Sequence, residues 1–252
     1  MLEQLAKHSA LVKIERAENH ISYLSARVRE FVASNPYRFA VERDPDTKAP
    51  TLVLRVDKDV PVDFAPIIGD AIHNLSSALD HIVFDLVKPD NAAMERRVQF
   101  PFCKDAASLE PTLKTRFIQR APKEAIDIIR AVQPYPGGNG ALLHAIHDLD
   151  ITDKHKLLVT VTGMTGVNNA DVVGTSGTVM MLRNMRIGPI KDGLKIIQVG
   201  GANSQLNIDE NIKPAFEITF GDGPLWGKEV FGALREFVAQ VADVVVSLEP
   251  FA

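Results

Sequence analysis

The sequence is poor in the features that build disulfide frameworks, thiolate metal sites and membrane spans. Its 252 residues include one cysteine, Cys103, so neither an internal disulfide nor a cysteine-rich metal site can form. No stretch reaches the roughly eighteen consecutive apolar residues of a membrane helix. The first residues also lack the apolar run of a signal peptide. We therefore expect a protein of the reducing cytoplasm that has no membrane partner.

An excess of charge of one sign is also missing. The chain has 28 basic and 32 acidic side chains, for a formal net charge of −4. This balance does not favour a dedicated nucleic-acid binder, although a local basic patch is left open. No glycine-rich loop between a strand and a helix carries a P-loop or dinucleotide-binding fingerprint. A nucleotide cofactor is therefore not expected.

What the chain does have is enough apolar character, 46% of its residues, for one domain spanning residues 1–252. Hydrophobic periodicity and turn residues predict an α+β fold, with a helical core and an antiparallel sheet from the C-terminal half. The predicted parts are a helical and hairpin part (1–156), a strand-rich part (157–222) and a closing helix (224–249). The predicted helices cover 3–33, 63–87, 122–132, a segment from about 141, and about 226–248. The predicted strands cover an N-terminal hairpin, 37–43 and 51–56, and then 157–161, 178–182, 194–199 and 215–220.

The predicted helix 63–87 has an unusual polar face. At about 100° per residue, its apolar residues share one broad face. The opposite face carries a stripe of Asp70, His73, Ser77, Asp80, His81 and Phe84. The segment has no Lys, Arg or Glu, the residues that usually cover a solvated helix face. We interpret the stripe as a seam that meets another element, either at a functional site or in a buried network of structural hydrogen bonds.

The segment 144–155 carries the second concentration of histidine. Three of its residues share one helix face through spacings of three and four: His144, His147 and Asp148. Asp150 or Thr152 is a candidate cap for a new helical turn within the segment. Five of the seven histidines fall in the windows 70–81 and 144–155. We therefore expect one site between these two segments.

A metal centre is the first chemistry that this arrangement would support. Asp70-x-x-His73 places a carboxylate and an imidazole one helical turn apart, as in the metal sites of helical bundles. The facing segment would complete the ligand set with His144, His147 and Asp153. Imidazole and carboxylate ligands without thiolate suit a divalent metal such as Zn, Mn or Fe, which could activate water for hydrolysis.

Metal-free acid–base catalysis is the second chemistry. A histidine oriented by an aspartate can transfer protons near neutral pH. The candidate pairs are His73 with Asp80, and His155 with Asp153 or Asp80. Together with His81, these pairs give a predicted catalytic set of His73, Asp80, His81 and His155.

The stretch from Gly69 to His81, GDAIHNLSSALDH, resembles the signature G-D/E-x-x-H-N-L-R-S-A-L-D-H of a widespread group of uncharacterised bacterial proteins. Gln133-Pro134-Tyr135 and Asp153-Lys154-His155 are similar to later motifs of that group. The resemblance spans roughly residues 36–158. It implies kinship with the group and no particular activity.

The R-S-A-L-D-H part of that signature is in turn similar to the Arg-x4-His motif of HEPN ribonucleases, helical proteins that cleave RNA without a metal. His81 matches the motif histidine, whereas Ser76 stands where the arginine would be. The arginine would stabilise phosphate charge, and serine cannot supply that cation. The resemblance implies an RNA-binding protein or a degenerate ribonuclease of a toxin or defence system. It further implies a dimer with His81 at the interface.

Three hypotheses follow for function. The leading one is a hydrolase-like enzyme that acts on a small polar molecule between helix 63–87 and segment 141–156. The second is the HEPN-like protein. The third is a non-enzymatic ligand-binding or scaffold protein, in which the seam fixes the register of the helices. The first and last helices could pack on each other or on a second copy, so a homodimer is left open.

Overall fold

The computed structural model describes residues 8–155, 160–167, 170–174, 179–182, 190–201, 203–207 and 214–252. These residues form an α+β fold, as predicted. The helices are α1 (Ser9–Ala33), α2 (Phe64–Val87), α3 (Ala92–Glu95), α4 (Ala106–Thr115), α5 (Lys123–Val132), α6 (Ala141–His155) and α7 (Val230–Leu248), with short 3-10 helices at Ile118–Arg120, Gly223–Leu225 and Glu249–Phe251. The strands are β1 (Tyr37–Arg43), β2 (Pro50–Val56), β3 (Thr160–Val167), β4 (Ala170–Gly174), β5 (Val179–Leu182), β6 (Leu194–Gln198), β7 (Leu206–Asn207) and β8 (Pro214–Phe220).

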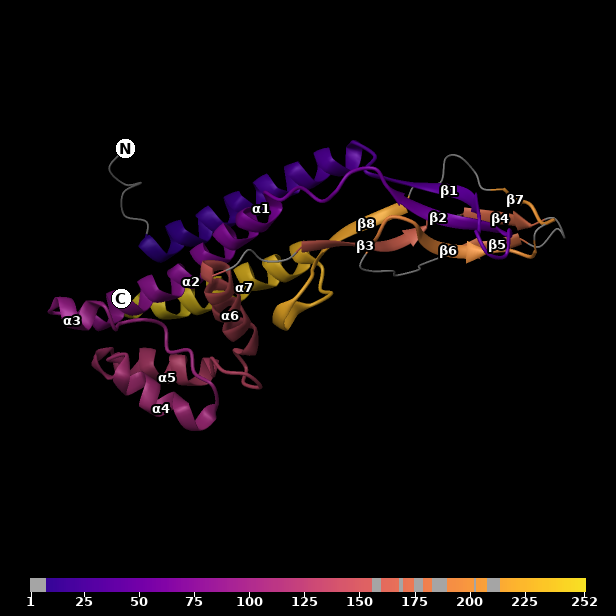
Figure 1. Ribbon diagram of the computed structural model, residues 1–252. Coiled ribbons are helices and arrows are strands. Elements are labelled where there is room, and N and C mark those ends of the chain that lie inside the picture. The colour runs from indigo at the N-terminus through magenta and orange to yellow at the C-terminus, as the bar shows by residue number, and fades with distance from the viewer. Residues whose placement is uncertain are drawn as a thin grey trace.

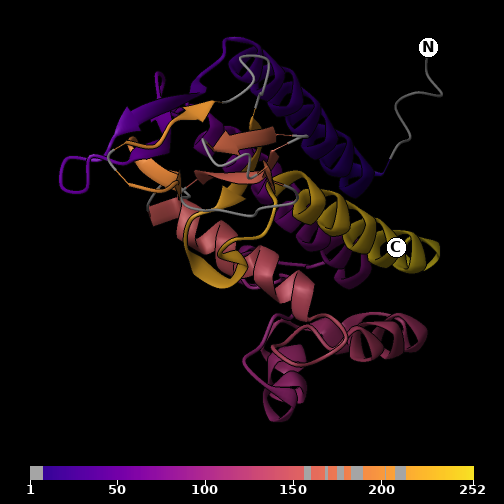
Figure 2. The ribbon, with the colours of Figure 1, turned by 90° about the vertical axis from the view of Figure 1, so that its right-hand side faces the viewer.

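Three long helices from distant parts of the chain form the core of the fold. α1, α2 and α7 contact one another and lie side by side (Figure 1). The strands extend from one end of this helical layer (Figure 1). α4 and α5 lie together to one side, beyond α6 (Figure 2). The predicted helical core of N-terminal, central and C-terminal helices is confirmed.

α2 is the central helix because it is apolar on more than one side. It contacts α1, α6 and α7, and its buried residues extend beyond the predicted apolar face to Ile72 and Val83, which are fully buried. A helix that is apolar around most of its circumference packs inside a core. The predicted polar stripe is the side of α2 that its neighbours leave partly open. Along it, Asp70, His73 and Phe84 are exposed, and Ser77, Asp80 and His81 are partly buried.

α1 and α7 each bury one stripe. In α1 the buried residues recur mainly at intervals of three, four or seven: Ala10, Ile14, Ala17, Leu24 and Phe31. Residues 3–7 of the predicted first helix lie outside the described residues. α7 begins at Val230, four residues later than predicted, because the Glu229 carboxylate accepts the backbone N–H groups of Phe231 and Gly232 and so caps the helix there.

The strands form antiparallel pairs throughout the described residues. β1 and β2 form the predicted hairpin, with Tyr37 opposite Val56 and Arg43 opposite Pro50. β6 joins the other edge of β2 across a bulge, although it lies far along the chain. β3 pairs with β8, and β4 pairs with both β5 and β7. The sequence did not predict β4 or β7.

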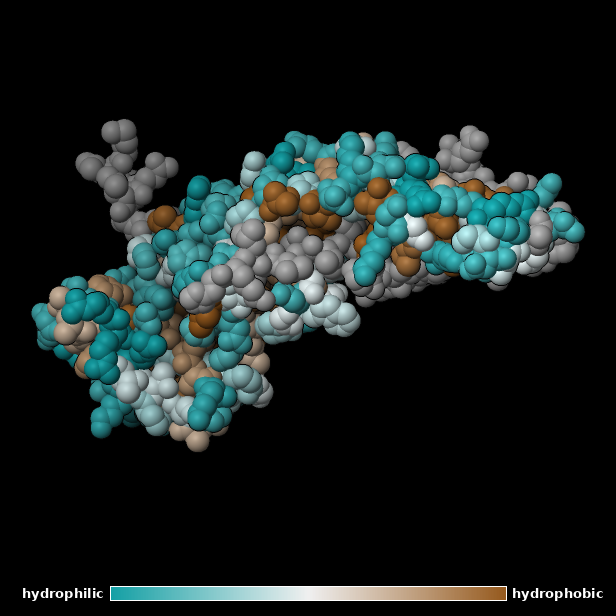
Figure 3. Space-filling model, in the orientation of Figure 1, coloured by the Kyte–Doolittle hydropathy of each residue, from teal (hydrophilic) through white to brown (hydrophobic). Residues whose placement is uncertain are grey.

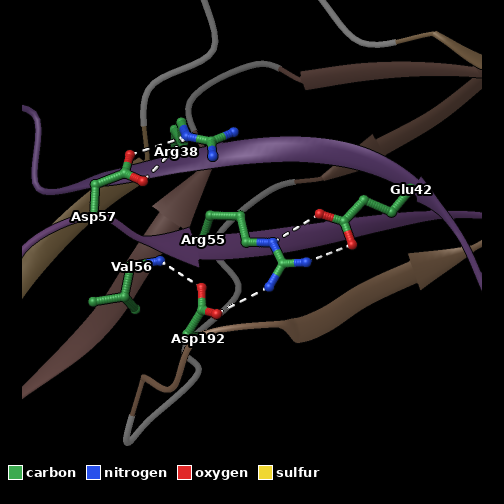
Figure 4. A network of polar contacts seen from close by, with 6 residues as sticks. All are labelled: Arg38, Glu42, Arg55, Val56, Asp57 and Asp192. Carbon is green, nitrogen blue, oxygen red and sulfur yellow. Dashed lines mark hydrogen bonds and ion pairs between the residues drawn. The ribbon is translucent and has the colours of Figure 1, made fainter.

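A network of ion pairs fixes the hairpin to the segment before β6 (Figure 4). The Arg55 guanidinium donates to both oxygens of Glu42, at 2.7 and 2.6 Å, and to Asp192 at 2.9 Å. The other Asp192 oxygen accepts the backbone N–H of Val56 at 3.0 Å. A planar guanidinium suits this geometry because its fork of N–H groups matches a carboxylate.

Other helical features also differ from the prediction, among them α3, which was not predicted. α4 was not predicted, because Pro111 stands inside it; the Asp105 side chain caps the helix by accepting the N–H of Ser108. α6 runs unbroken to His155, although Asp150 and Thr152 are candidate caps for a new helical turn. Instead, the Thr152 hydroxyl donates to the Asp148 carbonyl one turn back, which a continuous helix tolerates.

Hydrophilic residues cover much of the visible face of the long helices, and hydrophobic residues reach the surface mainly where the helical and strand-rich parts meet (Figure 3). Within the described ranges, no helix combines the length and the apolar character that a membrane crossing requires.

Candidate functional site

The candidate site lies where α6 packs against the open side of α2. α6 is held there by its buried residues Leu143, Ile146 and Leu149, which recur every three residues along one face. Asp150 follows directly and is also buried, with 4% of its surface exposed. Burial of a carboxylate is costly unless it gains partners, so its contacts define the site.

Asp150 pairs with His73 across the two helices. His73 Nδ1 and Asp150 Oδ1 are 2.9 Å apart, and the Lys154 ammonium donates to Asp150 Oδ2 at 2.7 Å. The His73 side chain is 52% exposed, whereas the Asp150 side chain is 6% exposed. The pair therefore has a buried carboxylate end and an imidazole end that reaches solvent.

The charge state of Asp150 follows from its partners. Burial by itself raises the pKa of this carboxyl, but the hydrogen bonds from Lys154 and His73 outweigh it and leave the pKa below its ordinary value. An ionised carboxylate only accepts hydrogen bonds, so Nδ1 of His73 must carry the hydrogen. In the neutral imidazole, Nε2 is then a free base on the ring edge away from Asp150.

Asp80 lies two turns along α2 from His73 and has a different environment. Its Oδ1 accepts the backbone N–H of Phe100 at 2.8 Å. Burial is the largest influence on the pKa of Asp80 and raises it, and the charge of Asp150 raises it further. The hydrogen bond from Phe100 and the charge of Arg116 lower the pKa but do not outweigh burial. Asp80 therefore anchors the segment after α3 to α2, and is not the partner that orients His73.

His144 and His147 on α6 pack against Phe102, and the charges of Asp150 and Lys154 also act on His147. The rings of Phe102 and His147 stack with centroids 4.5 Å apart, and His144 meets Phe102 edge to face. His144 Nδ1 lies 3.2 Å from Asp148 Oδ2. Burial, and secondarily the charge of His144, lowers the pKa of His147. These two histidines are held by aromatic packing and by Asp148.

Asp70 and Asp153 are the remaining candidates from the sequence. Asp70 is exposed, and its carbonyl accepts the side-chain N–H of Asn74. The Asp153 carboxylate lies directly against the backbone of Gly69, so closely that a Cβ at that position would overlap it. Asp153 therefore lies where α6 packs tightly against the backbone of α2.

His81 points to a different neighbour. Its Nδ1 lies 3.1 Å from the Ser9 hydroxyl at the start of α1. The predicted catalytic set therefore divides: His73 and Asp80 face the side of α2 towards α6 and Phe100, and His81 faces α1. His155 ends α6, and its side chain lies outside the described residues.

The predicted metal ligands make separate contacts. The described part of the chain contains no group of three or more His, Cys, Asp or Glu side chains arranged to hold a metal ion. His73 nevertheless has the arrangement of many metal-binding histidines, because one ring nitrogen is fixed by a carboxylate and the other is open. Binding of Zn, Mn or Fe stays a prediction.

The sequence did not reveal Asp150 as the partner of His73, or Lys154 as the partner of Asp150. Asp150 was one of two candidate helix caps, with Thr152, because both residue types are common at that position. A continuous helix would have placed Asp150 next to the apolar face of Leu143, Ile146 and Leu149. Asp150 and Lys154, spaced by four residues, would then have been recognised as an ion pair at the helix contact.

Comparisons with protein-family models, with curated proteins and with solved structures found no match to this chain. The resemblances to the bacterial group and to HEPN ribonucleases therefore stay predictions. Ser76, at the position of the HEPN arginine, is 5% exposed and faces the core. RNA binding and dimerisation at His81 are tested by RNA cleavage and by the mass of the protein in solution.

Proposed function

We propose that this protein is a hydrolase-like enzyme that uses His73 as a general base and Asp150 as the group that orients it. The observation that carries the proposal is the 2.9 Å pair between a buried aspartate and a half-exposed histidine on separate helices. An imidazole whose Nδ1 is held by an ionised carboxylate keeps Nε2 ready to accept a proton near neutral pH.

In this mechanism His73 Nε2 accepts a proton from a water molecule as the water attacks an electrophilic carbon or phosphorus of the substrate. The resulting imidazolium is stabilised by the Asp150 carboxylate 2.9 Å from Nδ1. The same imidazolium then returns the proton to the leaving group. Lys154 keeps Asp150 ionised, since its ammonium occupies the second carboxylate oxygen.

The surroundings favour a small polar substrate. Asp70 and Ser77 lie within one helical turn of His73 on the open side of α2, and the Lys154 side chain is 54% exposed. These groups can hydrogen-bond polar parts of a substrate, while an open surface of this kind buries little apolar area.

A divalent metal is the alternative use of the same His73 nitrogen. Elemental analysis of the purified protein and of His73→Gln separates the two chemistries. Near-stoichiometric Zn, Mn or Fe that is lost in the variant would assign His73 as a ligand. Absence of metal in both proteins, together with activity that survives a chelator, would support proton transfer by His73 itself.

The activity test is hydrolysis of a panel of small chromogenic esters, amides and phosphate esters. His73→Gln should lower the rate by about 10²–10⁴-fold, the usual contribution of a general base. Asp150→Asn should also lower it, since the amide no longer enforces the Nδ1-protonated tautomer. His20→Gln on α1 is the control and should act as wild type. Loss of stability in His73→Gln without loss of activity would favour the third hypothesis, a structural network.

A further inference from the structure

A second cluster of reactive groups lies away from His73, where the start of α1 meets the end of α2. His8 precedes α1 and caps it, because its Nδ1 accepts the backbone N–H of Ala10. His8 Nε2 lies 3.0 Å from the Asp85 carboxylate on α2. This double contact fixes the first turn of α1 against the last turns of α2, and so fixes the position of Ser9.

Ser9 and His81 form a hydroxyl–imidazole pair in this cluster. The Ser9 Oγ and His81 Nδ1 are 3.1 Å apart, within hydrogen-bonding distance. Ser9 is exposed and His81 is partly buried. The pKa of His81 is lowered by burial and, to a smaller extent, by the charge of Lys13. The charge of Asp85 raises this pKa but does not outweigh burial. His81 is therefore neutral at pH 7 and can accept the Ser9 proton.

Two further features of this position assist a nucleophile. Ser9 is the first residue of a 25-residue helix, and the positive end of the helix dipole favours negative charge developing on its oxygen. His8, which precedes Ser9, and Asp85, one turn from His81, line a hollow together with Phe84, Lys88, Pro89 and Ala252. The hollow offers apolar groups and the Lys88 cation to a bound ester.

We propose that Ser9 is a nucleophile activated by His81, and that it accepts an acyl group from small esters that bind in this hollow. The Ser9 oxygen forms a bond to the ester carbonyl carbon while the proton of the hydroxyl moves to His81 Nδ1. The carbon–oxygen bond to the alcohol then breaks, and His81 gives the proton to the departing alcohol. Water releases the acyl group by the same steps in reverse order. The site is independent of His73.

The test is reaction with a fluorophosphonate probe, in which the serine oxygen bonds to phosphorus and fluoride leaves while His81 takes the proton. Peptide mass spectrometry should find the probe on Ser9, and Ser9→Ala should remove that label. Ser247→Ala is the matched control: Ser247 is an exposed helical serine whose hydroxyl donates to the Asp243 carbonyl. It should leave labelling of Ser9 unchanged.

His81→Gln distinguishes activation from mere exposure. Glutamine keeps a hydrogen-bonding side chain but cannot take the proton, so labelling of Ser9 should slow by at least about 10²-fold while circular dichroism shows an intact fold. In wild type the labelling rate should rise as the pH increases through the lowered pKa of His81 and should be level above pH 6.5. The charges of Lys13 and His8 lower that pKa and the charge of Asp85 raises it.

Three results would overturn the proposal. Labelling of Ser9 no faster than labelling of Ser247 would show that the hydroxyl is ordinary. An equal labelling rate in His81→Gln would show that the imidazole does not activate it. Labelling that ceases in His73→Gln would show that the two sites are not independent. Normal labelling of Ser9 in His73→Gln would support this proposal, even if the function proposed for His73 fails its own test.

Discussion

Gly69→Ala tests the contact that brings α6 onto α2. Gly69 is a buried helical residue, and the Asp153 carboxylate occupies the space that a side chain at position 69 would need. The two helices can therefore approach only because this residue has no Cβ. The substitution adds a single methyl group at the centre of the candidate site and leaves His73 and Asp150 unchanged.

The expected magnitude combines two opposing effects. Replacing a mid-helix glycine by alanine gains about 1 kcal/mol of helix propensity. Overpacking a tight contact costs about 1–3 kcal/mol, and the upper half of that range applies where the displaced group is a partly buried carboxylate on a short side chain. We expect Gly69→Ala to lower the free energy of unfolding by about 1–2 kcal/mol.

The assay is urea unfolding followed by circular dichroism, with Gly69→Ala made in wild type and in an Asp153→Ala background. Without the carboxylate, the methyl group fits, and Gly69→Ala should stabilise the protein by about 1 kcal/mol. The coupling energy between the two positions is then about 2–3 kcal/mol, near the upper end of values for contacting residues. Any other loss caused by Asp153→Ala cancels in this cycle. Stabilisation by Gly69→Ala in wild type, or the same change in both backgrounds, would refute the close approach.

Two further predictions concern charged residues. Asp80→Asn keeps an acceptor for the Phe100 N–H but removes a carboxyl whose pKa is raised by burial. Urea titrations should therefore show the variant to be more stable than wild type at neutral pH, where the buried carboxyl of wild type is charged. The difference in stability should vanish as the pH falls through the raised pKa towards 3.8. Arg55→Ala should lower the free energy of unfolding by about 1 kcal/mol in low salt and by less in high salt, because its partners Glu42 and Asp192 are partly exposed. An equal effect of Arg38→Ala, whose side chain is 59% exposed, would contradict the importance given to the Arg55 network.

Much of the fold could be predicted because its signals are local. The helices α1, α2 and α5 and the hairpin of β1 and β2 agree with their predicted ranges to within one or two residues over the part that is described. Their apolar residues repeat with the period of a helix or a strand. Asn35-Pro36 marks the end of α1, and Asp44-Pro45 marks the end of β1. α4 was missed because Pro111 in its interior argues against a helix, although the Asp105 cap stabilises its first turn.

The contact between α2 and α6 was predictable, but the pairs of side chains within it were not. The concentration of histidine in two windows located the contact between α2 and α6, and the structure places His73 there. It pairs His73 with Asp150, 77 residues away along the chain, and not with Asp80 on the same helix. Residues seven positions apart on a helix lie two turns from each other, too far for a direct hydrogen bond.

The sequence by itself determined the long helices, their apolar faces and where the imidazole and carboxylate groups are concentrated. These properties follow from interactions within one or two turns of backbone. Only the tertiary structure decided that His73 meets Asp150 while His81 meets Ser9. The packing angle of α6 and α1 on α2 selects these partners, and it depends on the shape of the whole buried surface, including the missing side chain of Gly69.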